Sequence, residues 1–202
     1  FWVTLWCDEE RGLTGSRGFI GQIDSAELAR PGPRDGVPLA DKIRKIGGDP
    51  AAMTAYRHLP GSIAGYVELH IEQGGVLDEA GLDIGVVEGI VGIRSWDVAV
   101  TGFANHAGTT PMPIRKNALL AAADLALAVD RIVKSRPGRQ VGTVGRFEVS
   151  PGAQNVVPGE VSLSIETRDL SMDTLDALWV EIERAGTDIM ARHGTTWTVK
   201  AR

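Results

Sequence analysis

Residues 117–134 read NALLAAADLALAVDRIVK, and this stretch decides the fold. Its apolar residues recur at intervals of three and four positions, which places them on one face of an amphipathic α-helix. Pro137 and Gly138 follow and predict where the helix ends. The residues of the apolar face are Leu119, Ala122, Leu125, Ala126, Val129, Ile132 and Val133.

Runs rich in apolar residues predict strands on both sides of this helix. Ser171 predicts the N-cap of a second helix, whose apolar face runs from Leu175 to Ile189. From the second strand onward the elements read β-α-β-β-α-β, the order of a split βαβ sandwich with one antiparallel sheet and two helices. The predicted strands are residues 86–93, 96–101, 140–149, 160–167 and 195–200.

The first part of the chain predicts a separate unit. Residues 1–7 and 66–71 are expected to be strands, and residues 37–46 have the spacing of an amphipathic helix. We therefore expect an α/β protein in two parts, residues 1–88 and residues 89–202. Because the chain begins and ends within core-type segments, the sequence also predicts a fragment of a longer protein.

The composition limits the class of partner. The 202 residues carry a net charge of −5 with no basic stretch to offset it, which argues against nucleic acid. No stretch is long and apolar enough to cross a membrane, and the N-terminus lacks a signal-peptide pattern. Cys7 is the only cysteine, so an intrachain disulfide is excluded and we expect a cytoplasmic protein.

Two polar clusters in the first part suggest metal chemistry. Asp8-Glu9-Glu10 follows an apolar run, and adjacent carboxylates can divide their work between cation binding and general base catalysis. His70 lies at the end of an apolar run and just before a glycine pair, where an imidazole can bind a metal or move a proton. Taken alone, each cluster is better explained by its alternative, a solvated acidic turn or a satisfied strand-end histidine.

Three candidate residues lie in the second part. Gly108 permits a tight turn that would leave His106 exposed as a hydrogen-bond donor to an oxyanion. Asn155 lies on a loop bounded by proline and glycine, and Arg168 ends a strand, where its guanidinium can bind a carboxylate through two hydrogen bonds. The alternatives are a turn histidine without a role and a local pair between Arg168 and Asp169.

In this order the clusters resemble the M20-type metal-dependent amidohydrolases. The branch concerned contains N-carbamoyl-L-amino-acid hydrolases, β-ureidopropionases and allantoate amidohydrolases. The resemblance implies a catalytic α/β domain, part of which is residues 1–88, interrupted by a β-α-β-β-α-β lid and dimerisation domain, residues 89–202. The matching stretches, which span nearly the whole chain, are residues 8–10, 15–17, 70–74, 105–112, 155–159 and 167–169.

For the first part, the resemblance implies a site for two divalent metal ions. Glu9 would be the general base, Glu10 and His70 would be metal ligands, and Gln73 would contact the substrate. Carboxylate and imidazole ligands suit zinc, manganese, cobalt or nickel equally. The remaining ligands of the family would lie outside residues 1–202, so the resemblance also predicts a fragment that lacks some of them.

For the second part, the resemblance implies lid residues that reach an active site. His106 would polarise the scissile carbonyl, in the partner subunit of a homodimer, and would also contact the substrate. Asn155 and Arg168 would hold the carboxylate of a small ureido or carbamoyl substrate. Lid closure would exclude water from that site.

We therefore expect a hydrolase of the C–N bond in N-carbamoyl-L-amino acids. Allantoate amidohydrolase is the alternative within the branch, because both substrates require a carboxylate clamp and a carbonyl polariser. Two alternatives come from other classes. One is a non-catalytic fragment that dimerises through the lid, and the other is an M20-fold aminopeptidase, whose motifs around the acidic pair and the lid histidine differ from those here.

Overall fold

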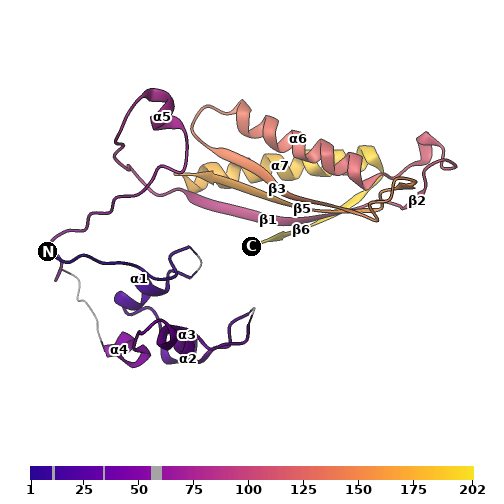
Figure 1. Cartoon of the computed structure of the whole chain (residues 1–202). Coiled ribbons are helices and arrows are strands. Elements are labelled where there is room, and N and C mark those ends of the chain that lie inside the picture. The colour runs from indigo at the N-terminus through magenta and orange to yellow at the C-terminus, as the bar shows by residue number, and fades with distance from the viewer. Residues whose placement is uncertain (11, 34, 56–60) are drawn as a thin grey trace. The chain divides into compact units, whose positions relative to one another are not determined.

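The structure is a computed structural model that describes residues 1–10, 12–33, 35–55 and 61–202. It consists of two compact units, Phe1–Val76 and Leu77–Arg202 (Figure 1). The predicted division into residues 1–88 and 89–202 stays a prediction.

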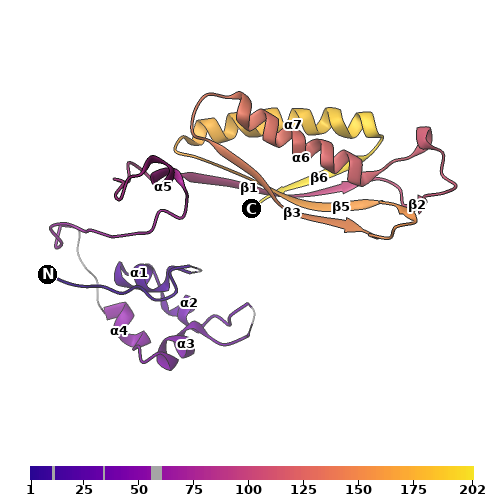
Figure 2. The same ribbon diagram turned by 45° about the horizontal axis from the view of Figure 1, so that its top comes forward.

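The second unit is built on a four-stranded sheet in the order β3-β5-β1-β6. All three pairings are antiparallel. Two long helices, α6 (Ala118–Ser135) and α7 (Met172–His193), cover one face of this sheet (Figure 2). The predicted α/β class and the β-α-β-β-α-β order of this unit are confirmed. The strands are β1 (Gly92–Thr101), β3 (Val141–Ser150), β5 (Glu160–Asp169) and β6 (Thr196–Ala201).

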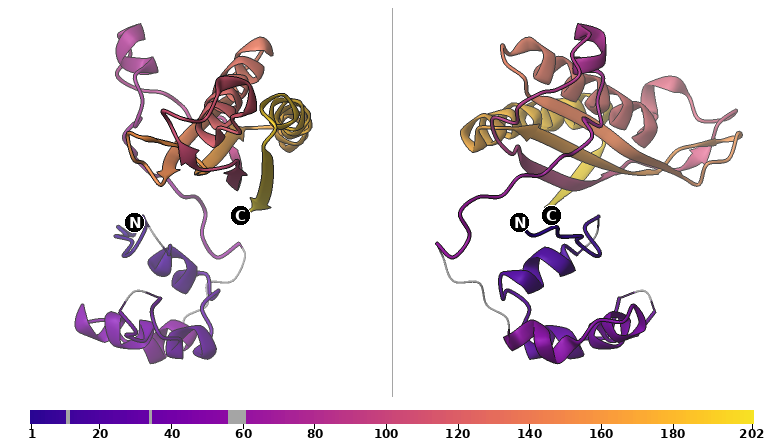
Figure 3. Two further views of the ribbon diagram at one scale, coloured as in Figure 1. Left: turned by 90° about the vertical axis from the view of Figure 1, so that its right-hand side faces the viewer. Right: turned by 60° about the vertical axis from the view of Figure 1, so that its left-hand side comes forward.

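The core of this unit lies between the sheet and the two helices, as the end-on view of Figure 3 shows. Every second residue is buried there from Trp96 to Val100 of β1 and from Val161 to Thr167 of β5, while the residues between them lie on the open face. Leu125 of α6 is fully buried against them. Trp96 of β1 stacks on Trp179 of α7 with ring centroids 4.0 Å apart, which ties the second helix to the sheet.

Side-chain caps determine where the two helices begin. The Asn117 side chain accepts hydrogen bonds from the N–H groups of Leu119 and Leu120 at the start of α6. The Ser171 hydroxyl accepts from the N–H of Thr174, which confirms the predicted N-cap of α7. Gly194, at φ 61°, ends α7 in the left-handed conformation that glycine adopts without strain.

The two strands predicted over residues 86–93 and 96–101 are corrected to a single strand, β1. Its register with β5 is continuous, from Gly92 opposite Asp169 to Thr101 opposite Glu160. Residues 86–91 lie outside any strand, and Val86 is 89% exposed. Apolar β-branched residues favour an extended chain, but the strand begins only where β5 supplies hydrogen-bond partners.

The first unit is a cluster of short helices around a small core. The buried residues Ile23, Leu28 and Ile43 pack with Leu39 and Met53. The predicted helix over residues 37–46 is confirmed as α3 (Leu39–Lys45). The other helices are α1 (Thr14–Phe19), α2 (Ser25–Ala29) and α4 (Pro50–Ala55), and α5 (Val76–Ala80) lies where the units divide.

The prediction of strands over residues 1–7 and 66–71 is wrong, because the structure has no strand there. Within the described residues, neither segment pairs with a strand. Val67 and Leu69 are 96% and 97% exposed. Alternating apolar residues predict a strand only where a neighbouring strand and a core are present to receive them.

Among the described residues, no helix combines the length and the apolarity that crossing a membrane requires.

Close packing at Gly186 of α7 gives a first prediction. A Cβ at this position would overlap the ring of Trp197 on β6. Gly186→Ala gains about 1 kcal/mol of helix propensity, but overpacking costs about 1–3 kcal/mol. We expect a net loss of about 1 kcal/mol in the free energy of unfolding, measured by urea denaturation. The exposed neighbour substitution Thr187→Ala should stay within about 0.5 kcal/mol, and a Gly186→Ala variant more stable than the parent would contradict the packing.

Candidate active site

Two very short strands bring together residues that are far apart in the chain. β2 (Asn105–His106) pairs antiparallel with β4 (Val156–Val157). The N–H of Ala107 donates to the carbonyl of Asn155 at 2.9 Å. His106 and Asn155, two of the predicted lid residues, therefore lie on adjoining backbone segments. In Figure 1 this β2–β4 arm lies at one end of the large sheet.

Backbone contacts fix the arm to the rest of the unit. The N–H of Gly102 donates to the carbonyl of Gly159 at 2.8 Å, and the N–H of Phe103 donates to the carbonyl of Lys116 at 2.8 Å. A Cβ on Gly102 would overlap that Lys116 carbonyl oxygen. Glycine is therefore required where the chain leaves β1 for the arm.

The imidazole of His106 is exposed and rests on its own turn. Nδ1 accepts a hydrogen bond from the N–H of Gly108 at 3.0 Å. The turn continues into a 3₁₀ helix, η1 (Met112–Ile114), which leads to α6. His106 is thus a surface side chain on a hydrogen-bonded loop, as the glycine pattern predicts.

Arg115 is a residue that sequence reasoning missed. Its guanidinium donates to the carbonyls of Ala107 and Thr110, which belong to the His106 turn. Because both acceptors are backbone groups, no side-chain pairing in the sequence signals this contact.

Arg168 lies far from His106 within one chain. The arm joins β5 near Glu160, and Arg168 is eight positions farther along that strand. At about 3.3 Å per residue, these two ends of β5 are about 26 Å apart. A small substrate cannot reach both His106 and Arg168 of the same chain.

The local partner of Arg168 is Glu166, not the predicted alternative, Asp169. Nε and Nη2 of Arg168 both lie 2.7 Å from Oε1 of Glu166. This contact uses one edge of the guanidinium. The Nη1–Nη2 edge remains suited to a carboxylate.

The acidic loop of the first unit turns back on itself. Asp8 has φ 55°, and its carbonyl accepts from the N–H of Leu13 at 2.8 Å. Its carboxylate accepts from the Thr14 hydroxyl at 2.5 Å. Glu9 and Glu10 are exposed. Asp8 therefore shapes the turn, and the two glutamates remain available for chemistry.

His70 and Gln73 lie on an exposed segment of the first unit. Nδ1 of His70 lies 2.5 Å from the carbonyl oxygen of Ile71, so Nδ1 is the donor and Nε2 keeps its lone pair. That is the tautomer in which Nε2 can bind a metal. Gln73 has φ 54°, a backbone conformation that few residues with a side chain adopt.

The predicted metal ligands do not complete a metal site here. Among the residues that the structure describes, no group of three or more His, Cys, Asp or Glu side chains could hold a metal ion. Glu10 and His70 are at most two ligands, and a structural or catalytic ion needs three or four from the protein. Glu10 and His70 by themselves therefore do not make a two-metal centre.

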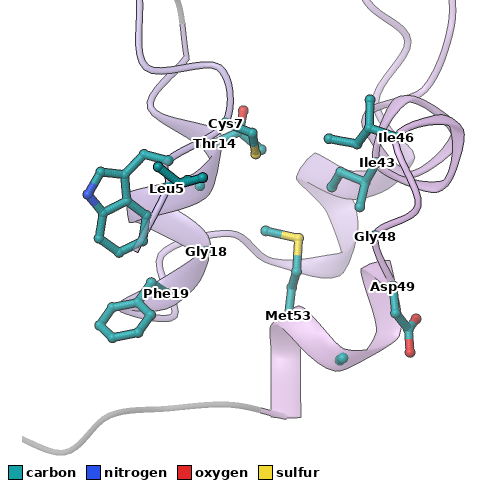
Figure 4. A pocket seen from close by; sticks show the side chains of 13 residues that line it. Leu5, Cys7, Thr14, Gly18, Phe19, Ile43, Ile46, Gly48, Asp49 and Met53 are labelled. Atoms are coloured by element: carbon teal, nitrogen blue, oxygen red, sulfur yellow. The ribbon is translucent and has the colours of Figure 1, made fainter. Parts of the chain in front are cut away.

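The cavity of the first unit is not the predicted site. It has a volume of about 340 Å³ and lies between α1, α3 and α4, with Met53 pointing into it (Figure 4). Its lining is mostly apolar and does not include Glu9, Glu10 or His70. Its polar side chains include Cys7, Thr14 and Asp49, and the Thr14 hydroxyl already donates to Asp8.

The face of the large sheet that lies opposite the helices carries a charged network. Arg202 donates to both oxygens of Asp97 at 2.8 and 2.6 Å, and Arg146 donates to Oδ1 at 2.9 Å. The hydrogen bonds from Arg202 hold the pKa of the Asp97 carboxyl below its usual value, and the charge of Arg146 adds to the effect. These contacts join β1 to β3 and to the residue that follows β6.

Comparison with known proteins identifies the second unit. A family model described as a peptidase dimerisation domain, M20_dimer, matches residues 89–192. The chain belongs to the M20 family. Its relatives and structural neighbours are hydantoinase/carbamoylase-type amidohydrolases, as the motifs around His70 and His106 predict.

The similar proteins include N-carbamoyl-L-amino acid amidohydrolase of Geobacillus stearothermophilus, 38% identical over 185 residues, which are 89% of this chain and 45% of that protein. Ureidoglycolate hydrolase of Arabidopsis thaliana is 49% identical over 111 residues, 54% of this chain and 23% of that protein. A crystal structure of a hydantoinase/carbamoylase family amidase from Burkholderia phymatum superposes with a TM-score of 0.84 at 31% identity, over 98% of this chain and 49% of that chain. The chain thus spans about half the length of the relatives that it matches over most of its own length.

Proposed function

We propose that this M20 chain is part of a hydrolase that cleaves the C–N bond of the ureido group in N-carbamoyl-L-amino acids. The observation that carries the proposal is the β2–β4 arm, which presents the His106 imidazole beside Asn155. The relative from Geobacillus stearothermophilus bears the name of that activity. We assign the activity to the whole protein, of which this chain supplies the lid and part of the catalytic unit.

In this proposal His106 polarises the scissile carbonyl through an imidazole N–H. A fixed donor aimed at the developing oxyanion is stronger in the transition state than in the ground state, which is the condition for catalysis. Asn155 donates its side-chain amide to the substrate carboxylate, and Arg168 binds the same carboxylate through its guanidinium.

The separation of these residues favours a site shared by two copies. Arg168 lies about 26 Å along β5 from the strand end that carries the arm. A carboxylate that contacts both Asn155 and Arg168 therefore takes one from each of two chains. M20_dimer, the family model that matches residues 89–192, is described as a dimerisation domain, which is consistent with this arrangement.

For the first unit we propose the roles that the M20 family motifs imply. Glu9 takes a proton from the attacking water, and Gln73 contacts the substrate. Glu10 and His70 would contribute two ligands to a pair of divalent ions, zinc, manganese, cobalt or nickel, and the remaining ligands would come from outside residues 1–202. The single cysteine supports a cytoplasmic location.

Allantoate is the second candidate substrate. Allantoate deiminase of Arabidopsis thaliana is 32% identical over 196 residues, and ureidoglycolate hydrolase of the same plant is 49% identical over the shorter match. Allantoate also carries a carboxylate and ureido groups, so the same clamp serves both substrates. A non-catalytic role for this length of chain, as a dimerising piece, is the third candidate.

The experiment is a substrate panel with the whole protein. We expect ammonia release from N-carbamoyl-L-amino acids to exceed release from allantoate, no cleavage of unmodified dipeptides, and loss of activity on chelation of divalent metals. Preferred turnover of allantoate would select the second candidate. Preferred cleavage of dipeptides, or activity indifferent to chelation and to His70→Ala, would refute the proposal.

A further inference from the structure

The turn that carries His106 determines which ring nitrogen faces outward. The N–H of Gly108 donates to Nδ1 at 3.0 Å. A backbone amide can only donate, so Nδ1 is an acceptor, and a neutral ring then carries its proton on Nε2. Because the side chain is exposed, the ring presents an Nε2–H donor to its surroundings.

Thr110 closes this turn from its buried side. Its N–H and its hydroxyl both donate to the carbonyl of His106, at 3.1 and 2.7 Å. Thr110 is only 8% exposed, so these bonds are protected from water. The N–H of Ala107, the residue after His106, donates to the Asn155 carbonyl. The backbone is therefore held both before and after Gly108.

Arg115 connects the two ends of the His106 turn. Its Nε donates to the Thr110 carbonyl at 2.9 Å, and its Nη2 donates to the Ala107 carbonyl at 2.5 Å. These carbonyls flank Gly108, whose amide reaches the imidazole. The guanidinium is planar and its donors are fixed relative to one another, so one side chain sets the spacing of both carbonyls.

Gly108 allows the ring to lie on the backbone. A Cβ at this position would lie 3.1 Å from Cε1 and 3.4 Å from Nδ1 of His106. A side chain there would push the ring away from the amide. The contact therefore depends on glycine at 108 as well as on the brace from Arg115.

We propose that Arg115 and Gly108 are positioning residues that hold His106 as the Nε2–H tautomer. The lid then offers a hydrogen-bond donor at a pH where an ordinary imidazole is uncharged. The inference rests on the proposed function in one respect only, which is that the substrate carbonyl is the acceptor of the Nε2–H hydrogen bond. The tautomer is a property of the turn and is measurable without substrate.

The test is long-range ¹H–¹⁵N NMR of the histidine side chains in the 202-residue chain, near pH 8, where free imidazole is neutral. His106→Gln assigns the resonance by its loss. We expect the Nε2–H pattern in the parent chain and a mixture of tautomers in Arg115→Met and in Gly108→Ala. The control Arg94→Met removes an arginine that pairs with Asp176 and should leave the His106 signal unchanged.

An Nδ1–H pattern in the parent chain, or a parent pattern in both Arg115→Met and Gly108→Ala, overturns the proposal. If Arg115→Met does not fold, Arg115→Lys takes its place, because lysine keeps the positive charge but lacks the planar guanidinium. Spectra of Arg115→Lys and Gly108→Ala that both match the parent spectrum would then refute the proposal. Absence of hydrolysis in the substrate panel, with the expected tautomer, refutes the proposed function alone. Hydrolysis with the wrong tautomer refutes this inference alone.

Discussion

His106→Ala in the whole protein is expected to lower kcat/KM for the ureido substrate by about 100- to 1,000-fold, the usual effect of losing one oxyanion donor. The loss should fall on kcat with little change in KM, because the bond strengthens only as charge develops on the carbonyl oxygen. Steady-state kinetics measure both constants. The imidazole is exposed, so the free energy of unfolding should change by less than about 0.5 kcal/mol.

His193→Ala is the matched control. This histidine also belongs to the second unit, but its Nε2 contacts Asp124 at 2.7 Å and joins the end of α7 to α6. Its replacement should lower stability and leave kcat unchanged. A His106→Ala enzyme within threefold of the parent kcat would show that the ring does not act on the carbonyl.

Periodicity was sufficient to predict the order of the two long helices and the four long strands of the second unit. Over residues 117–134 the apolar positions define one helical face, and in β1 and β5 they alternate, so both elements point their apolar residues at one core. Together with buried residues of α7, they make the core of this unit. That is why the order of the elements follows from the sequence.

The first unit shows where the same reasoning fails. The residues of segments 1–7 and 66–71 have the pattern of strands, yet the segments lie extended and mostly exposed among the described residues. An alternating pattern indicates residues that favour a half-buried position beside a neighbouring strand. It carries no information about whether that neighbouring strand is present. His70 therefore lies on a segment that forms no strand among the described residues, and its role as a metal ligand stays a prediction.

The candidate site was predicted by residue type but not by arrangement. His106 and Asn155 are joined by strands of two residues each, too short for any periodicity to reveal. Arg168 is remote from both because β5 is ten residues long, a consequence of pairing and not of the motif. Arg115 contacts only carbonyl groups, so its role has no signature in side-chain chemistry.

Leu127→Arg is expected to convert a dimer of this chain into a monomer. Leu120 and Leu127 are 50% and 65% exposed on α6, which packs beside β3. β3 is an edge strand of the sheet, so its outer backbone groups are open to a second copy. A charge placed on that surface would have to be buried unpaired in the dimer, which costs several kcal/mol. Sedimentation velocity of the 202-residue chain measures the change.

Val180→Arg is the control for this surface. Val180 is 64% exposed on α7, so the substitution has the same chemistry at the same exposure on the other helix. It should leave the dimer intact. A Leu127→Arg chain that still sediments as a dimer, or a parent chain that is already monomeric, would place the interface elsewhere or remove it.

The proposed dimer would have a consequence for activity that follows from the length of β5. If His106 of one copy serves the site that contains Arg168 of the other, mixing the inactive variants His106→Ala and Arg168→Ala rebuilds one intact site in every mixed dimer. Random exchange makes half of the dimers mixed, so about a quarter of the parent activity should return. Adding Leu127→Arg to both variants should abolish this recovery. Recovery without dimers would mean that one chain brings the two residues together, although the arm that carries His106 joins β5 at the end opposite Arg168.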